Sequence, residues 1–183
     1  MTDTPRLTIR RAAVLGAGVM GAQIAAHLAN ADVPVLLYDL AASDGPPDGI
    51  ARAAIARLGT LDPAPFASPE RAAHVEPASY AHDLARLADC DLVIEAIAEK
   101  LEWKTALYAQ VAPHLRADAV FASNTSGLSI ATLAAALPAG LRCKADLGSA
   151  TAAPAPASTP SARPRTPAPR LAGPSTPSSS HAC

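Results

Sequence analysis

The chain has 183 residues and a formal net charge of -1, and half of its residues are apolar although only 3% are aromatic. This length is sufficient for one ordinary domain with a core built from alanine, leucine and valine. The near-neutral charge gives no general attraction to nucleic acid or to an anionic membrane, and no apolar run approaches the roughly 20 residues that span a bilayer. Three widely spaced cysteines fit neither a disulfide framework nor a metal site. We therefore expect a cytoplasmic protein with no metal, no nucleic-acid partner and no membrane partner.

Apolar runs alternate with helical patterns along most of the chain. Strands are predicted at 11–15, 33–39, near Val75, 91–97 and 119–124. Helices are predicted after Gly21 and at 50–58, 101–115 and 128–137. Because the strands are apolar throughout and are separated by helices, they predict a parallel sheet that is covered on both faces. We expect an α/β fold with a doubly wound parallel sheet of the Rossmann type.

The first predicted strand ends in a glycine-rich turn, GAGVMG at residues 16–21. The pattern G-x-G-x-x-G is weak by itself, but here it lies between a strand and a helix, and Asp39 ends the next strand. In such a turn Gly16 permits the tight bend, Gly18 lets the backbone approach a pyrophosphate, and Gly21 lets the helix pack closely against the strand. The free amides at the start of the helix favour the phosphates. The turn predicts a dinucleotide site.

The acidic residue indicates which dinucleotide fits. Asp39 follows Gly21 by eighteen residues, where its carboxylate can accept hydrogen bonds from a ribose 2′-hydroxyl and would repel a 2′-phosphate. No arginine follows it, so NAD is favoured over NADP. The simpler alternative is a glycine turn beside a solvated aspartate, with no ligand.

Two further polar patches follow later predicted strands. The segment EAIAEKLEWK carries Glu95, Glu99 and Lys104, and the segment SNTSGLS at 123–129 carries hydroxyl and amide side chains. Both lie where a doubly wound sheet holds its ligand, at the carboxyl ends of its strands. Each patch alone is more simply interpreted as a solvated helix start or a helix cap.

Taken together and in this order, the motifs resemble the NAD-binding domain of the 3-hydroxyacyl-CoA dehydrogenases of fatty-acid β-oxidation, over about residues 9–142. The motifs that carry the resemblance are GAGVMG, YD, DLVIEAIAEKLEWK and FASNTSGLSI. The resemblance implies NAD as the cofactor and an acyl-CoA as the substrate. The implied reaction is hydride transfer from C3 of an L-3-hydroxyacyl-CoA to NAD, which gives the 3-oxoacyl-CoA.

The resemblance also implies roles for particular residues. The acid that matches Asp39 holds the adenosine ribose, and Met20 flanks the pyrophosphate. Ser126 matches the serine that contacts the 3-hydroxyl or 3-keto oxygen of the substrate, and it is the one catalytic residue that the match supplies. Beyond the glycine turn, the implied cofactor site includes Ile97, Ala98, Glu99, Lys104, Asn124 and Ser126.

The resemblance breaks after the serine loop. The family's catalytic histidine lies there in a motif of the type H-F-F-N-P, followed by an orienting glutamate, whereas residues 141–157 read LRCKADLGSATAAPAPA. None of the five histidines is expected at the carboxyl end of a strand; they are His27, His74, His82, His114 and His181. General acid–base catalysis is worth about 10²–10⁴-fold, and a serine hydroxyl cannot replace an imidazole. We therefore expect little or no dehydrogenase activity from this chain.

The composition changes sharply near Leu141, and the following sequence is rich in Pro, Ser, Thr and Ala. It cannot bury enough surface to offset an ordering entropy of roughly 1–2 kcal/mol per residue. We expect a dinucleotide-binding domain at 1–142 and a disordered tail at 143–183, with no counterpart of the family's all-helical C-terminal domain. Out-of-frame reading of GC-rich DNA, truncation and a flexible linker would each explain the tail.

Loss of the helical domain would expose apolar surface, so we expect self-association or aggregation. Two other functions stay open at this point. One is a stand-alone dinucleotide-binding module or pseudoenzyme, and the other is a different NAD-dependent hydroxy acid dehydrogenase.

Overall fold

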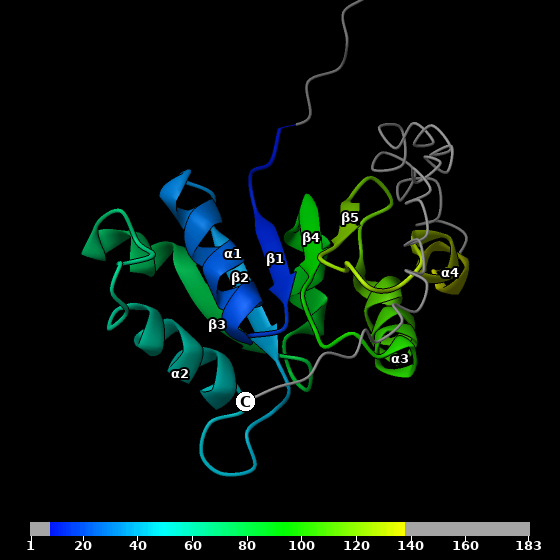
Figure 1. Ribbon diagram of the computed structural model, residues 1–183, viewed down its shortest axis with the longest axis horizontal. Helices are drawn as coiled ribbons and strands as arrows, with labels where there is room; N and C mark the ends of the chain where they lie inside the picture. The colour runs from blue at the N-terminus through cyan, green and yellow to red at the C-terminus, as the bar shows by residue number, and fades with distance from the viewer. Residues whose placement is uncertain (1–7, 138–183) are drawn as a thin grey trace, which may run out of the picture. The chain divides into compact units, whose positions relative to one another are not determined.

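The computed structural model describes residues 8–137, so the predicted boundary at 142 and the predicted tail at 143–183 lie outside the described residues. Within this part, one sheet contains β1 (Ala12–Leu15), β2 (Val35–Asp39), β3 (Val75–Ser79), β4 (Leu92–Glu95) and β5 (Val120–Ser123). The strand order is β3-β2-β1-β4-β5 and every pairing is parallel (Figure 1). The chain builds outward from β1 to β3 and then crosses back to β4, which confirms the doubly wound sheet.

Four α-helices lie in the described part of the chain, and each overlaps a predicted one. They are α1 (Val19–Asn30), α2 (Gly49–Leu58), α3 (Leu101–Val111) and α4 (Ile130–Ala136). The described part also contains three short 3₁₀ helices. η1 (Pro69–His74) and η2 (Leu84–Asp89) were not predicted, whereas η3 (Ala112–His114) lies within the helix predicted at 101–115. Such short helices contain too few turns to show a hydrophobic period. No helix within residues 8–137 combines the length and the apolar character that a membrane crossing requires.

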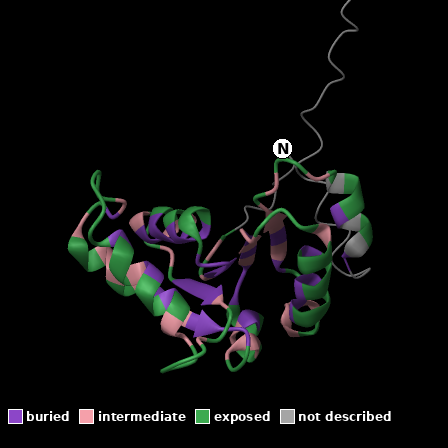
Figure 2. Cartoon of the chain, turned by 60° about the horizontal axis from the view of Figure 1, so that its bottom comes forward, coloured by how far each residue is buried: buried purple, intermediate pink, exposed green. Residues whose placement is uncertain are grey.

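Successive residues of each strand pack on opposite faces of the sheet. Val14 belongs to a cluster with side chains of α1 and α2, whereas Leu15 belongs to a cluster with side chains of α3 and α4. Figure 2 shows the strands as buried and the helices as buried toward the sheet and exposed on their outer sides. Because both faces are covered, β1 is apolar throughout, and β2, β4 and β5 are apolar at every position except the last.

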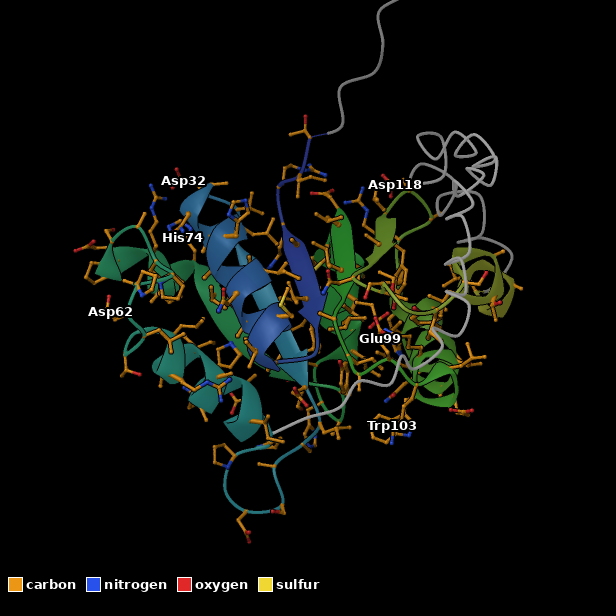
Figure 3. The ribbon with its side chains drawn as sticks, in the orientation of Figure 1. Asp32, Asp62, His74, Glu99, Trp103 and Asp118 are labelled. Carbon is orange, nitrogen blue, oxygen red and sulfur yellow. The ribbon has the colours of Figure 1, made fainter. Side chains whose placement is uncertain are left out.

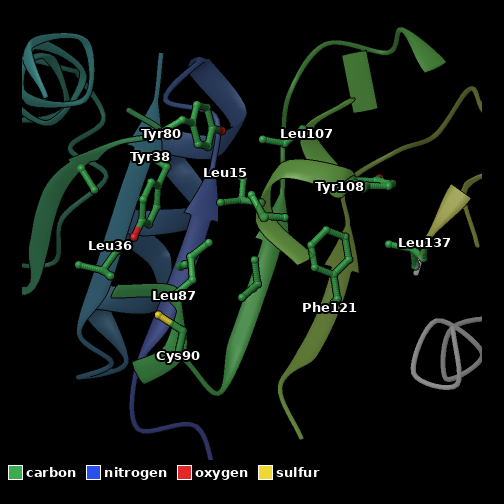
Figure 4. Packing of buried hydrophobic residues seen from close by; sticks show 14 of the residues in the cluster. Leu15, Leu36, Tyr38, Tyr80, Leu87, Cys90, Leu107, Tyr108, Phe121 and Leu137 are labelled. Carbon is green, nitrogen blue, oxygen red and sulfur yellow. The ribbon is translucent and has the colours of Figure 1, made fainter. Parts of the chain in front are cut away.

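The two faces of the sheet are filled by different kinds of side chain. Helix α1 contacts its face through alanines that are at most 1% exposed: Ala22, Ala25, Ala26 and Ala29. The other face contains most of the buried aromatic residues (Figure 4), where Tyr38 stacks on Tyr80 and Tyr108 meets Phe121 edge to face, whereas Phe66 belongs to the cluster with α1. Mostly small residues on one face and most of the large rings on the other explain how a chain so poor in aromatic residues fills its core.

Asp91, just before β4, links separate segments of the chain at the edge of the sheet where the strands begin. Its carboxylate accepts hydrogen bonds from the Arg10 amide at 2.8 Å and from the Arg116 guanidinium at 2.8 Å. The backbone and side-chain hydrogen bonds from Arg10 lower the pKa of Asp91 to about 2. The aspartate is therefore ionised at neutral pH and holds the N-terminal segment against the start of β5.

Candidate functional site

A pocket of about 520 Å³ opens at the carboxyl edge of the sheet. Its lining includes the segments that follow β1 and β4, the two neighbouring strands between which the strand order reverses. This reversal point is where open α/β sheets bind their ligands. The lining residues are Gly16, Gly18, Asp39, Leu40, Tyr80, Ala96, Ile97, Ala98, Trp103, Ala106, Leu107 and Gln110.

The three glycines of the turn face different surroundings. Gly16 has a φ of +111°, and a Cβ there would lie 2.8 Å from the Ala96 carbonyl oxygen. A Cβ on Gly21 would collide with the Gly16 carbonyl oxygen, so this glycine permits α1 to approach the end of β1. A Cβ on Gly18 would meet no atom within 4 Å. The fold therefore requires Gly16 and Gly21, whereas the space above Gly18 is open.

Helix α1 begins at this open space. Gly18 is its N-cap residue, and no side chain in the described part of the chain caps it. The amides of a helix's first turn have no partner within the helix and carry its positive dipole end. Val19 and Met20, which are 67% and 56% exposed, flank the turn. The arrangement provides amide donors and an apolar rim beside the pocket.

Asp39 ends β2 next to the glycine turn. Its Oδ2 accepts a hydrogen bond from the Ala17 amide at 2.6 Å, and its Oδ1 accepts one from the Leu40 amide at 2.7 Å. A carboxylate has roughly four acceptor sites, so further hydrogen bonds remain available on the pocket side. Asp39 thus fixes the glycine turn and also presents negative charge to the pocket.

Glu95 forms a buried polar centre behind the pocket. Its side chain is fully buried, and Oε1 accepts hydrogen bonds from Lys104 Nζ at 2.5 Å and from the Ile97 amide at 2.8 Å. Oε2 accepts hydrogen bonds from the Tyr108 hydroxyl at 2.9 Å and from Ser123 Oγ at 2.7 Å. This network joins β4, α3 and β5 and fixes the loop that forms the pocket wall.

Lys104 lies differently from what the resemblance implied. Its side chain is fully buried against Glu95 and does not line the pocket, although it was expected to line the cofactor site. Helix spacing explains this position, because Lys104 lies three and four residues before the buried Leu107 and Tyr108, on the face of α3 that packs against the sheet.

The loops after β4 and β5 meet through Glu99 and Ser126. Glu99 Oε1 accepts hydrogen bonds from the Ser126 amide at 2.9 Å, the Ser126 hydroxyl at 3.0 Å and the Gly127 amide at 3.1 Å. These hydrogen bonds, led by the one from the Ser126 amide, lower the pKa of Glu99. Figure 3 shows Glu99 and Trp103 toward the end of the molecule where the strands finish. The structure therefore joins the two later motifs of the sequence.

The predicted cofactor residues divide into two groups around this pocket. Those that line it are Gly16, Gly18, Asp39, Ile97 and Ala98. Those that lie outside its lining are Met20, Gly21, Glu99, Lys104, Asn124 and Ser126. Sequence reasoning missed the lining residues Leu40, Tyr80, Ala96, Trp103, Ala106, Leu107 and Gln110. Their only signals were positions just after a strand and on α3.

None of the histidines within residues 8–137 lines the pocket. His74 directly precedes β3, and Figure 3 places it at the opposite edge of the sheet from Glu99. His82 follows the carboxyl end of β3 by three residues. This corrects the expectation that no histidine lies near the carboxyl end of a strand. It is exposed, and it follows an edge strand of the sheet rather than the reversal point.

The family model described as "3-hydroxyacyl-CoA dehydrogenase, NAD binding domain" matches residues 11–144. The chain belongs to this family. The match confirms the predicted domain type and its cofactor.

Relatives of this NAD-binding domain are much longer proteins. The Deinococcus radiodurans protein named "Probable 3-hydroxyacyl-CoA dehydrogenase" is 44% identical over 123 residues, which cover 67% of this chain and 36% of that protein. The Pseudomonas aeruginosa fatty acid oxidation complex subunit alpha is 37% identical over 134 residues, which cover 70% of this chain and 18% of the subunit. The structure of 3-hydroxybutyryl-CoA dehydrogenase from Escherichia coli K12 matches with a TM-score of 0.60 and 35% identity, over 74% of this chain and 29% of that one.

Proposed function

We propose that this 3-hydroxyacyl-CoA dehydrogenase domain binds NAD across the carboxyl edge of its sheet, with the adenosine half in the pocket. The observation that carries the proposal is the open space above Gly18, the N-cap residue of α1, in a pocket that Asp39 also lines. A pocket whose lining is largely apolar, with a few polar groups, suits a flat base attached to a charged group.

Each part of the site would hold a different part of the dinucleotide. The amides of the first turn of α1 would bind the diphosphate, since they are unpaired donors at the positive end of a helix dipole. Asp39 would accept hydrogen bonds from the adenosine ribose and would repel a phosphate on that ribose. Ile97, Ala98 and the loop that joins Glu99 to Ser126 would extend the site toward the nicotinamide.

The reaction that we propose for the whole protein is the oxidation of an L-3-hydroxyacyl-CoA to a 3-oxoacyl-CoA. NAD supplies the hydride acceptor when bound. Ser126 would align the substrate oxygen, and Glu99 would hold Ser126 in place through the hydrogen bonds described above.

A dinucleotide-binding module without turnover of its own is the second candidate. The observation that favours it is that no histidine of the described residues lies in the pocket. A hydroxyl at neutral pH cannot take over the proton transfer that an imidazole performs. We therefore propose that the chain binds NAD and oxidises acyl-CoA substrates slowly or not at all.

Calorimetric titration of the full chain with NAD and with NADP tests the binding proposal. We expect saturable binding of NAD and weaker binding of NADP, and an Asp39→Asn variant should narrow that difference because it removes the repelling charge. Equal affinity of the wild-type chain for both dinucleotides would contradict the role of Asp39. An assay of acetoacetyl-CoA reduction by NADH decides between the two candidates, since rapid turnover would exclude the module.

Two further proposals concern the environment of the chain. We propose a cytoplasmic location, which is supported by three widely spaced cysteines that fit no disulfide framework. We also propose self-association, supported by the exposed apolar side chains Val19, Met20, Leu40 and Trp103. Light scattering at two protein concentrations tests it, and a constant monomer mass would contradict it.

A further inference from the structure

Tyr80 carries a polar group that the fold leaves without a partner. The residue directly follows β3, and its amide donates to the Asp39 carbonyl oxygen at 3.0 Å, which places it level with the end of β2. The side chain is only 7% exposed, and its hydroxyl has no hydrogen-bond partner among the described residues. A buried hydroxyl without a partner destabilises a folded protein, so its presence at this position calls for an explanation.

Tyr80 lines the pocket, together with Trp103 and Asp39. Figure 4 shows Tyr80 beside the end of β1, next to Tyr38 and across from Leu107 of α3. Burial, followed by the nearby carboxylates of Asp39 and Glu95, raises the pKa of Tyr80, so its hydroxyl stays protonated at any physiological pH.

The neighbouring tyrosine provides a direct contrast. Tyr38 stacks on Tyr80 with ring centroids 5.8 Å apart and an angle of 18° between the planes. The Tyr38 hydroxyl donates to the Asp83 carbonyl oxygen at 2.7 Å and is absent from the pocket lining. The two stacked tyrosines thus differ. Tyr38 does not line the pocket and its hydroxyl is hydrogen-bonded, whereas Tyr80 lines the pocket and its hydroxyl has no partner among the described residues.

We propose that Tyr80 is the residue that recognises the base of the dinucleotide, with its hydroxyl hydrogen-bonded to the polar edge of the adenine ring. The proposal rests on the proposed NAD site and adds a specificity-determining contact to it. The Tyr80 hydroxyl is an unpaired polar group on a residue of the pocket lining, and an adenine edge supplies both acceptors and a donor. Trp103, the single tryptophan of the chain, lines the same pocket and reports on its occupancy.

Tyr80→Phe tests the proposal, and Tyr38→Phe is its matched control. Trp103 fluorescence follows titrations with NAD, with adenosine 5′-monophosphate and with nicotinamide mononucleotide, and thermal unfolding is measured without ligand. For Tyr80→Phe we expect the affinities for NAD and for adenosine monophosphate to fall by the same factor, about threefold to tenfold. The melting temperature without ligand should stay the same or rise, because an unsatisfied group has been removed. Tyr38→Phe should lower the melting temperature and leave both affinities unchanged.

Each other outcome overturns the proposal. Unchanged affinities in Tyr80→Phe while the wild-type chain binds NAD would exclude Tyr80 as the base-recognising residue and leave the proposed function intact. A drop in melting temperature with unchanged affinities would assign the hydroxyl to structure alone. A folded wild-type chain that does not bind NAD would refute this proposal and the proposed function together.

Discussion

Replacement of Lys104 by Met tests whether this lysine acts inside the fold rather than at the ligand. Its side chain is 0% exposed, and its Nζ lies 2.5 Å from Glu95 Oε1. Methionine keeps most of the apolar stem, so the change removes the charge and one hydrogen bond with little change in volume. Glu95 keeps its three other donors but loses its countercharge in a fully buried position. Removal of one partner of such a pair costs about 3–5 kcal/mol, a large share of the 5–15 kcal/mol that typically stabilises a domain.

Urea unfolding followed by circular dichroism measures this cost. Lys100→Met is the matched control, because Lys100 is exposed and its ammonium lies 4.2 Å from the centre of the Trp103 ring, a contact worth about 0.5–1 kcal/mol. The double variant Glu95→Gln with Lys104→Met should be more stable than Lys104→Met alone, because no buried charge then stays unpaired. Equal, small losses in Lys104→Met and Lys100→Met would refute the buried pair.

Three other predictions follow from the same structure. Gly18→Ala should unfold at nearly the same urea concentration as the wild type and should bind NAD more weakly. Gly21→Ala should be less stable than the wild type, because its Cβ meets the Gly16 carbonyl. Equal stability of the two variants would contradict this prediction. Asp91→Asn should be less stable than the wild type near neutral pH, and the difference should vanish as the pH falls from about 3.8 toward about 2, because the unfolded chain takes up the Asp91 proton first. Urea unfolding across this pH range checks it, and a difference that does not depend on pH would be inconsistent with the lowered pKa. Glu99→Gln should loosen the Ser126 loop, and faster amide exchange at Ser126 and Gly127 measures this; unchanged exchange would argue against the contact.

Most of the fold could be predicted because its strands are buried on both faces. The apolar runs at 91–97 and 119–124 became β4 and β5, shortened by a residue or two at each end. The helix predicted at 101–115 ends earlier as an α-helix, at Val111, because the chain continues as a 3₁₀ turn that contains Pro113. Proline lacks the amide that an α-helix interior requires. A prediction from the spacing of apolar residues takes no account of this missing amide.

The site was predictable where the backbone conformation allows only one type of residue. Gly16 and Gly21 are such positions, because no other residue fits there. The Glu95 centre was not predictable, since its four donors come from three separate segments that only the folded sheet brings together. Lys104 could have been placed from its spacing to Leu107 and Tyr108. Tyr80 gave no signal, because an unsatisfied hydroxyl is visible only once its surroundings are known.

The most direct test of the account is an NMR titration of the isotope-labelled full chain with NAD. We predict that the largest amide shifts fall on Gly16, Gly18 and the residues that end β2 and β4, while His74 and Asp91, at the other edge of the sheet, do not move. Shifts confined to that other edge, or a folded chain whose spectrum NAD leaves unchanged, would contradict the assignment of the glycine turn and its pocket to this cofactor.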